Sequence, residues 1–384
     1  MSEVAANQAT LAVVTDLGTE TLQEISPRQL AWIRFKRHRL AMISAGFLIA
    51  MYLITVFCEF VAPYNTDTRN VKAINAPPMS IHFFDAEGNF HLRPFVYGYD
   101  MEINPDTWMR EYKENTEEMY PIYFFEAGES YQMWNLFEAE THLFATREGY
   151  IHVFGTDQLG RDMFTRVFYG ARISMSIGVV GVMLTLFFGV LIGGIAGYMG
   201  GIVDRGIQRI IEVLLSLPTL PFWMALSAAL PVEWSSLMVY FGITIILSLF
   251  GWPGLARQVR GKFLALREED FVMAARLLGA GRLRVIFRHM MPSFTSHIIT
   301  TATLAVPGMI LGETALSFLG IGLRPPVVSW GVLMQQAQNY QVIVMTPWLM
   351  IPGLFVVLTV IAFNLLGDGL RDAADPYNTG GNRN

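Results

Sequence analysis

The sequence predicts an all-α integral membrane protein with six transmembrane helices and an extracytoplasmic insert between the first two. Of its 384 residues, 53% are hydrophobic and only 15% are charged, whereas ordinary soluble domains carry about 25% charged residues. The mean hydropathy is +0.39. The chain also contains six runs, free or nearly free of charge, of the about 20 residues that a helix needs to cross the hydrocarbon core. Composition and run length therefore favour a multi-pass membrane protein.

The six apolar runs define the expected spans. They cover residues 40–58, 173–203, 213–232, 234–256, 298–323 and 341–367. We expect Pro218 and Pro221 to bend the third run, because proline removes a backbone donor and clashes with the preceding turn. The third and fourth runs lie so close together in the sequence that they must form a hairpin.

Lys and Arg near the ends of the runs predict the orientation, because short cytoplasmic loops carry an excess of both. Four basic residues precede the first run, and a basic loop from Arg257 to Arg288 follows the fourth, so both are expected inside. The predicted division is a cytoplasmic tail (1–39), a first span (40–60), an extracytoplasmic insert (61–154), a core with five spans and a cytoplasmic loop at 257–292 (155–367), and a cytoplasmic tail (368–384). The long insert holds basic residues yet falls outside, since long loops translocate largely regardless of charge.

Composition also removes several classes of function. The net charge is −5 and no long block of one sign occurs, so nucleic acid is not expected as a partner. The one cysteine, Cys58, can form neither an intrachain disulfide nor a thiolate metal cluster. The first 25 residues are polar and lack the pattern of a secretory signal, so we expect them to be disordered in the cytoplasm.

Glycines recur every fourth residue in the second run, at Gly189, Gly193 and Gly197, with Gly201 continuing the series. Such spacing leaves one helical face without side chains, so another helix can approach closely. The alternative is that glycine is simply commoner in membrane helices than in soluble ones.

The loop at 257–292 carries eight Lys and Arg and predicts a helix, a turn and a second helix. An apolar face recurs at helical spacing on Phe271, Ala274, Ala275 and Leu278. Acidic residues occupy the first turn, where the helix dipole favours them, and glycines at 279–281 break the helix. A second helical pattern then runs to Pro292. The loop could lie on anionic lipid, but small alanines beside a glycine turn favour entry into a protein groove.

The stretch FVMAARLLGAGRLRVIFRHMMP (271–292) resembles the cytoplasmic signature of permease subunits in binding-protein-dependent ABC importers. Ala274, Ala275, Gly279 and Pro292 match the family pattern, whereas Met273 stands where the family has Glu. Four further stretches resemble the dipeptide and oligopeptide type of permease: GTDQLGRDMFTRVFYGARIS (155–174), VLLSLPTLP (213–221), ETALSFLGIGLRPPVVSWG (313–331) and AFNLLGDGLRDAADP (362–376). The resemblance implies the type I importer permease fold, in the second or C-type permease, and a place in the bacterial cytoplasmic membrane.

The resemblance also implies partners. The chain would form half of a translocation pathway with a homologous permease, and two ATPase subunits and an extracytoplasmic binding protein would complete the importer within membrane lipid. The residues expected to dock on the ATPase are Glu269, Asp270, Phe271, Met273, Ala274, Ala275, Arg276, Gly279 and Ala280. On this interpretation the apolar members pack in the ATPase groove, Gly279 permits the turn and Arg276 pairs with acidic groups of the partner.

Energy and substrate are expected from outside the chain. No Gly-x-x-x-x-Gly-Lys-Ser/Thr loop occurs in the sequence, so ATP and Mg are expected on the ATPase partner, and the chain itself is not expected to be an enzyme. Peptides are the substrate class that the resemblance favours, while oligosaccharides, nickel and opines remain alternatives. No residues lining the pathway can be named.

Two alternative classes of function are a proton-coupled secondary transporter and an intramembrane protease. A proton-coupled secondary transporter would need paired acidic residues near mid-membrane and internal pseudo-symmetry, and neither is found. An intramembrane protease would need motifs such as His-Glu-x-x-His, which are absent from the sequence. Glu313, which interrupts the fifth run, is either a proton or substrate site or a structural residue near the outer end of its span. The resemblance favours the structural role.

The insert is expected to fold into a small cap. Its apolar bulk comes from aromatic residues, namely Trp108, the YPIYFF stretch at 120–125, Tyr131, Trp134, Phe137 and Phe144. Turn residues occur at 77–78, 85–89 and 104–105. We expect the cap to contact the soluble binding protein, and the alternative is that the aromatics fill the core of the cap itself.

Overall fold

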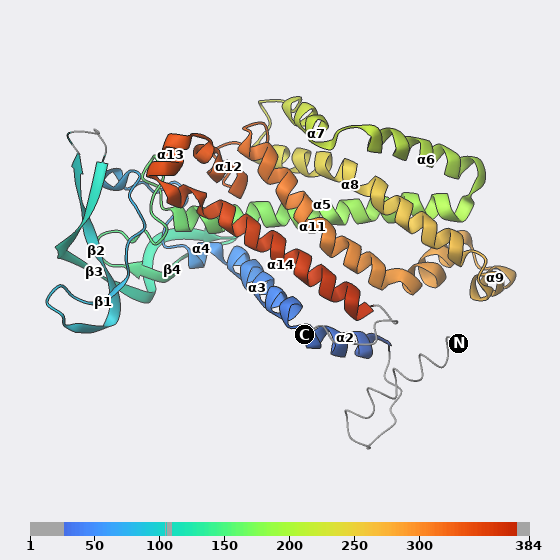
Figure 1. The fold of residues 1–384 in the computed structure, drawn as a ribbon, viewed down its shortest axis with the longest axis horizontal. Coiled ribbons are helices and arrows are strands. Elements are labelled where there is room, and N and C mark those ends of the chain that lie inside the picture. The colour runs from blue at the N-terminus through green and yellow to red at the C-terminus, as the bar shows by residue number, and fades with distance from the viewer. Residues whose placement is uncertain (1–26, 104, 106–109, 375–384) are drawn as a thin grey trace, which may run out of the picture.

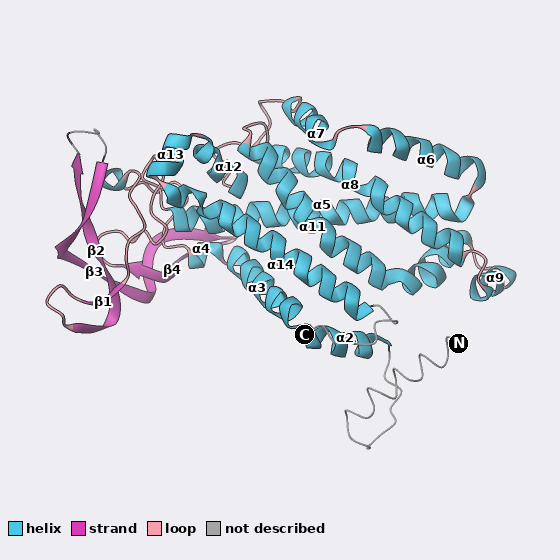
Figure 2. Cartoon of the chain, in the orientation of Figure 1, coloured by secondary structure: helices cyan, strands magenta, loops and turns pink. Residues whose placement is uncertain are grey.

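A computed structural model describes residues 27–103, 105 and 110–374. It shows an elongated bundle of helices with a β-sheet at one end and a short helix, α9, at the other (Figures 1 and 2). These are called the sheet end and the α9 end. The predicted disordered tail at the N-terminus, Trp108, Asn104 and most of the predicted C-terminal tail lie outside the described residues.

Five helices of the described chain are long and apolar enough to cross a membrane. They are α3 (Arg39–Val56), α5 (Met163–Met199), α8 (Ser236–Leu266), α11 (Thr295–Phe318) and α14 (Ile351–Ala374). The shorter helical elements are α2 (Pro27–Arg37), α4 (Cys58–Val61), η1 (Val71–Ala73), α10 (Arg282–Arg284), η2 (Val285–Met290), η3 (Met291–Phe294), α12 (Trp330–Met334), η4 (Gln335–Gln338), α13 (Tyr340–Met345) and η5 (Pro347–Met350). Five of the six predicted spans thus each contain one of these helices. The sixth begins later than predicted, because α13 and η5 occupy most of residues 341–350 and α14 starts at Ile351.

The third predicted span is instead a bent pair of helices. Helix α6 (Gly201–Ser216) meets α7 (Thr219–Ala228) at an angle of 87°, so the pair is either one broken span or a re-entrant loop. The predicted bend at Pro218 is confirmed, since this residue directly precedes α7. Pro221 lies in the first turn of α7, where a missing backbone donor costs no helical hydrogen bond, so it does not add a second bend.

Helix α5 begins ten residues before the predicted second span. Asp162 caps it, because its carboxylate accepts a hydrogen bond from the Thr165 backbone N–H at 2.7 Å. Further along, Arg172 donates from Nε to the Thr55 carbonyl at 3.0 Å, which places it beside the last turn of α3. The nine residues of α5 before Arg172 therefore extend about 13 Å beyond the level at which α3 ends.

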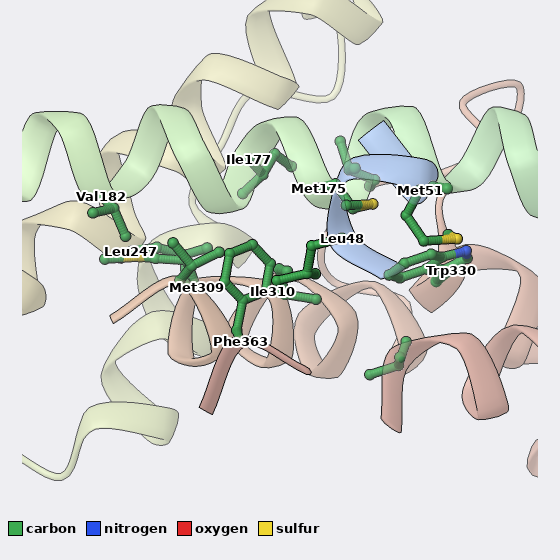
Figure 3. Close-up of a cluster of buried hydrophobic side chains, with 14 of the residues drawn as sticks. Leu48, Met51, Met175, Ile177, Val182, Leu247, Met309, Ile310, Trp330 and Phe363 are labelled. Carbon is green, nitrogen blue, oxygen red and sulfur yellow. The ribbon is translucent and has the colours of Figure 1, made fainter. Parts of the chain in front are cut away.

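Side chains from the five long helices, and from shorter ones such as α12, fill the centre of the bundle. Figure 3 shows part of this cluster. It includes Leu48 of α3, Met175 of α5, Leu247 of α8, Ile310 of α11 and Phe363 of α14, all less than a tenth exposed. Lipid tails are as apolar as these side chains, so van der Waals packing rather than a hydrophobic driving force holds such helices together.

The predicted glycine face brings α5 and α8 into backbone contact. A Cβ added at Gly193 would lie 2.5 Å from the Ala256 carbonyl oxygen, and one added at Gly197 would lie 2.8 Å from that of Arg260. Gly189 likewise abuts the Leu255 side chain. Gly201 is different, because no heavy atom among the described residues lies within 4 Å of an added Cβ there. Its φ of +59° instead belongs to the turn between α5 and α6.

The segment between α3 and α5 contains a four-stranded antiparallel sheet, so the all-α prediction is wrong for this part of the chain. The strands follow in the order β1 (His82–Phe84), β2 (Phe90–Ile103), β3 (Arg110–Met133) and β4 (Phe137–Thr146). The search for 20-residue apolar runs detects helices that cross membranes, but it does not detect strands whose side chains alternate between two faces.

The predicted turn at 85–89 is confirmed. Hydrogen bonds from His91 and Asn89 lower the pKa of its Asp85 to about 2.

The predicted cap is thus folded, but its aromatic residues fill less of the core than expected. The buried cluster is built on Met79, Val96, Ile122 and Ile151. Of the predicted aromatics Tyr131 is buried and Phe144 packs against the cluster, whereas others remain exposed, namely Phe124, Phe125, Trp134 and Phe137.

Candidate functional site

Helix α9 (Asp270–Leu277) is the short helix that the sequence predicts in the basic loop. It ends in a glycine turn, where Gly279 has a φ of +79° and donates its N–H to the Arg276 carbonyl at 2.9 Å. The Ala280 N–H reaches back to the Ala275 carbonyl at 3.0 Å. Residues with a side chain rarely adopt this left-handed conformation, so the structural need for Gly279 is confirmed.

One face of α9 packs against its own chain. Val272 is fully buried and Ala275 is 8% exposed, and both join a cluster with Phe263 of α8 and with Val285 and Met290 of η2. Ala275 was expected on the docking face, but the structure places it on the inward face of the helix. Val272, which the sequence did not single out, is the main contact of that inward face.

The other face of α9 exposes large apolar side chains. Phe271 and Met273 are 44% and 43% exposed, while Leu277 and Leu278 are 89% and 88% exposed. Ala274 lies on the same exposed side. The sequence identified four members of this face, namely Phe271, Met273, Ala274 and Leu278. It missed Leu277, which lies four residues after Met273 and so extends the same stripe.

The polar members of the predicted set lie at the ends of α9. Glu269 and Asp270 are exposed at its N-terminus, where the helix dipole favours negative charge. Arg276 holds its guanidinium 4.9 Å from the centre of the Tyr198 ring in α5, so it contacts its own chain. Ala280 is half-buried against the inward cluster. A cleft of about 550 Å³ lies beside this contact and is lined by Tyr198, Met199, Arg267, Glu268 and Arg276.

Helical structure continues from α9 into the membrane-spanning part. The second helical pattern expected in this loop is confirmed, and it consists of the single turn α10, the π-helical turn η2 and the 3₁₀ turn η3, which leads directly into α11. Because α8 ends at Leu266, just before α9, this short helix joins the ends of two long helices. A displacement of α9 would therefore act on α8 and α11 together.

A partly buried salt bridge also ties α6 to α8 at the α9 end. Arg260 donates from two nitrogens to the Asp204 carboxylate at 2.5 and 2.6 Å, a bidentate geometry that fixes both side chains. No sequence pattern indicates this pair, because the two residues lie 56 positions apart.

Glu313 is fully buried between α5 and α11, in the half of the bundle toward the sheet end. Its carboxylate accepts hydrogen bonds from the hydroxyls of Ser174 at 2.7 Å and Ser317 at 2.8 Å. The same two hydroxyls accept the backbone N–H groups of Trp330 and Leu323. Glu313 therefore holds the segment after α11 against α5, which favours the structural interpretation. Both serine partners belong to the same chain.

The GTDQLGRD stretch forms a second polar joint at the sheet end. Asp157 accepts the backbone N–H groups of Leu159 and Arg161 at 2.8 and 3.0 Å. Asp162 caps α5 and also bonds the buried His152 at 3.1 Å. This joint connects the insert to the start of α5. In the described ranges, no group of three His, Cys, Asp or Glu side chains could hold a metal ion.

Comparison with known proteins agrees with this architecture. The family model for the inner membrane component of binding-protein-dependent transport systems matches residues 189–378, and the model for the N-terminal transmembrane domain of oligopeptide transport permease C matches residues 26–78. The dipeptide transport system permease protein DppC of Bacillus subtilis is 32% identical over 354 residues, covering 92% of this chain and 86% of that protein. The oligopeptide transport system permease protein OppC of Haemophilus influenzae is 40% identical over 244 residues, covering 63% and 74%.

These matches define the chain first as a membrane permease, the inner-membrane component of a binding-protein-dependent transport system. More narrowly, it belongs to the family of dipeptide and oligopeptide ABC permeases, and to the C-type permeases within that family. The resemblance found in the sequence motifs is thereby confirmed.

Proposed function

We propose that this chain carries peptides across the bacterial cytoplasmic membrane as one half of an ATP-driven importer, and that α9 receives the mechanical work of a separate ATPase. The observation that carries the proposal is the two-sided character of α9. Its inward face is buried on the ends of α8 and η2, whereas its outward face leaves Leu277 and Leu278 almost fully exposed. A short helix at the end of the molecule with so much exposed apolar surface is typical of a docking element.

The docking surface that we propose differs from the one expected from the sequence. Its apolar members are Phe271, Met273, Ala274, Leu277 and Leu278. Glu269 and Asp270 at the N-terminus would supply polar contacts to the partner. Ala275, Ala280 and Gly279 support the helix from within, and Arg276 anchors it to Tyr198 instead of pairing mainly with the partner.

The proposed orientation places the α9 end and both chain termini in the cytoplasm and the sheet end outside. The excess of Lys and Arg in the loop around α9 supports this assignment. The proposed partners are a homologous permease, two ATPase subunits that bind ATP and Mg, and an extracytoplasmic binding protein. Exposed apolar residues along the bent pair α6–α7, such as Ile210 and Val213, provide a surface that fits the second permease.

The proposed mechanism is alternating access. When the ATPase subunits close on ATP, the groove that holds α9 moves, and α9 transmits the motion to α8 and α11. The pathway between the two permeases then opens outward to receive substrate. The residues of this chain only bind, pack and transmit, and no covalent step takes place on them.

The experiment that tests the docking surface compares Leu277→Asp with Leu283→Asp. Both side chains are exposed at the α9 end, at 89% and 68%, but Leu283 lies outside α9. We expect recovery of the ATPase with tagged Leu277→Asp chain to fall by about tenfold or more, because the groove would have to bury an unpaired carboxylate. Leu283→Asp should retain the ATPase. Equal recovery with both variants would refute the docking role of α9.

Substrate class and energy source are tested in proteoliposomes with the complete transporter. We expect labelled peptides to enter only when ATP is supplied. Uptake of labelled oligosaccharides in their place would overturn the peptide assignment, and peptide uptake that continues without ATP would instead support a proton-coupled transporter.

We further propose that the β1–β2 hairpin of the insert contacts the binding protein. It exposes Phe84, Phe90 and Leu92 at 61%, 60% and 88%. The test replaces Leu92 and Phe84 with Ser and measures binding of the soluble protein to the reconstituted transporter. Point changes are preferable to deletion of the insert, because Asn75 and Ala76 are hydrogen-bonded to Asp157 and Thr156 at the start of the core. Unchanged binding would defeat the proposal.

A further inference from the structure

The turn between β3 and β4 exposes a second apolar group on the insert. Trp134, Leu136 and Phe137 are 44%, 77% and 53% exposed. Trp134 and Asn135 both have positive φ, at 51° and 58°, which makes a tight hairpin turn with a fixed direction. The group is therefore displayed by a defined turn.

This turn is held against the end of helix α3. The Trp134 indole Nε1 donates to the Val56 carbonyl at 2.7 Å, and its ring lies 5.6 Å from that of Phe57. The Trp134 backbone N–H reaches the Glu59 carboxylate at 3.4 Å. Both strands of the hairpin also contact α4, and Figure 1 shows α4 beside β4. The tip of the hairpin thus lies where the apolar helix α3 ends.

The exposed side of α3 is apolar up to the turn, although Trp134 also borders a cavity that Glu59 and Arg172 line. Ile49, Leu53, Val56 and Phe57 are exposed along the helix, and no charged residue occurs between Leu40 and Cys58. A helix of this composition crosses the hydrocarbon core, so its end marks the boundary between acyl chains and headgroups. Trp and other aromatic side chains are enriched at this depth, because an apolar ring with a polar edge suits both neighbours.

We propose that Trp134, Leu136 and Phe137 insert into the membrane leaflet at the sheet end, so that the β3–β4 hairpin is a lipid anchor for the insert. The occupant of the surface is the acyl and headgroup boundary of the bilayer. The acidic Glu138 and Glu140, exposed just after the turn, exclude attraction to anionic lipid as the driving force. The anchor fixes the angle of the sheet to the membrane.

The test uses the two permeases and the ATPase subunits, without the binding protein, in phosphatidylethanolamine and phosphatidylglycerol liposomes, so that the β1–β2 hairpin stays uncovered. Cys58 is the only cysteine of the sequence, so Cys58→Ala gives a background in which Leu136→Cys, Phe137→Cys or Leu92→Cys carries one nitroxide label. Collision rates with lipid-soluble oxygen and with a water-soluble nickel chelate then report the surroundings of each label. Leu92, on the β1–β2 hairpin, is the matched aqueous control.

We expect labels at 136 and 137 to collide more often with oxygen, and the label at 92 to collide more often with the nickel chelate. The ratio of the oxygen to the nickel collision rate should be several-fold higher at 136 and 137 than at 92. Labels at 136 and 137 that meet nickel as often as the label at 92 would show that the turn lies in water. Labels shielded from both reagents would show that another protein covers it. Either result would overturn the lipid anchor while leaving the proposed importer function intact.

Discussion

The two ends of the helical bundle are held by different chemistry. At the sheet end, buried polar groups join the elements, as when Glu313 accepts two serine hydroxyls and Asp162 joins His152 to the first turn of α5. At the α9 end, contact between backbones at Gly193 and an apolar cluster around Val272 dominate. Hydrogen bonds fix distance and angle, whereas apolar contacts tolerate small shifts. The joints at the sheet end are therefore directional, whereas the contacts around α9 would tolerate a small displacement.

The salt bridge between Asp204 and Arg260 refines this comparison. It lies at the α9 end but joins α6 to α8, and α9 takes no part in it. Directional bonds therefore keep the long helices together at both ends. Apolar contacts without directional bonds are thus left to α9 and its glycine turn, which is where the proposed coupling to an ATPase needs freedom to move.

The largest expected effect comes from Gly193→Leu, which would separate α5 from α8. The added side chain would meet the Ala256 backbone, which cannot move without shifting the whole helix. We expect a loss of about 3 kcal/mol or more in stability, at the upper end of overpacking effects. The measurement is the yield of monodisperse chain and its thermal midpoint in detergent. Gly254→Ala on α8 is the control, because described atoms leave open space around that position; a Gly193→Leu chain with the control's midpoint would contradict the close contact.

A smaller loss is expected from Asp162→Ala at the sheet end. The change removes the cap of α5, worth about 1 kcal/mol, and leaves the buried His152 without its acceptor, which costs about 1–3 kcal/mol. Asp162→Asn keeps a carbonyl acceptor at the cap and should lose less stability than Asp162→Ala. Because Cys58 is fully buried beside this end, the rate at which a thiol reagent labels it on heating reports the opening. If both variants label at the original rate, the polar joint does not hold the sheet end.

Most of the helical fold could be predicted from the sequence, because the thickness of a membrane sets a length that apolar runs must reach. The start of α5 could not. Residues 163–172 include Arg166, whose charge indicates the end of a span, yet this side chain is only 4% exposed and donates to the Thr66 carbonyl. That contact joins positions 100 residues apart, so only the folded insert supplies it.

Helix α9 shows the same limit of sequence-based prediction at a smaller scale. Its existence and its glycine turn could be predicted from local spacing and from the need for positive φ at Gly279. The sequence does not predict which face of α9 turns inward, because the helix is apolar nearly all round. Two pairs of residues have helical spacing, Val272 and Ala275 on one face and Met273 and Leu277 on the other. The choice between the two faces is made by Met290 and Phe263, which pack on Val272 from outside the helix.

Val272→Ala tests whether apolar packing seats α9. Removing two buried methyl groups should cost about 1–2 kcal/mol locally. We expect faster amide hydrogen exchange across α9 and η2 and an unchanged rate in the strands. Leu277→Ala is the matched control, since its side chain contacts mainly solvent and its loss should leave exchange as it was. Exchange that rises equally in both variants would place the support elsewhere.

The smallest expected effect comes from Arg276→Ala, which removes the contact with the Tyr198 ring. A cation held over an aromatic ring at an exposed site contributes about 0.5–1 kcal/mol, so exchange in α9 should rise by a few-fold at most. Arg276→Lys keeps the charge but not the planar guanidinium, so its exchange rate in α9 should lie between those of the original chain and Arg276→Ala. If Arg276→Ala instead abolishes ATPase binding with no change in exchange, Arg276 acts on the partner, as the sequence motif first indicated, and the α9 end would be seated by its apolar cluster alone.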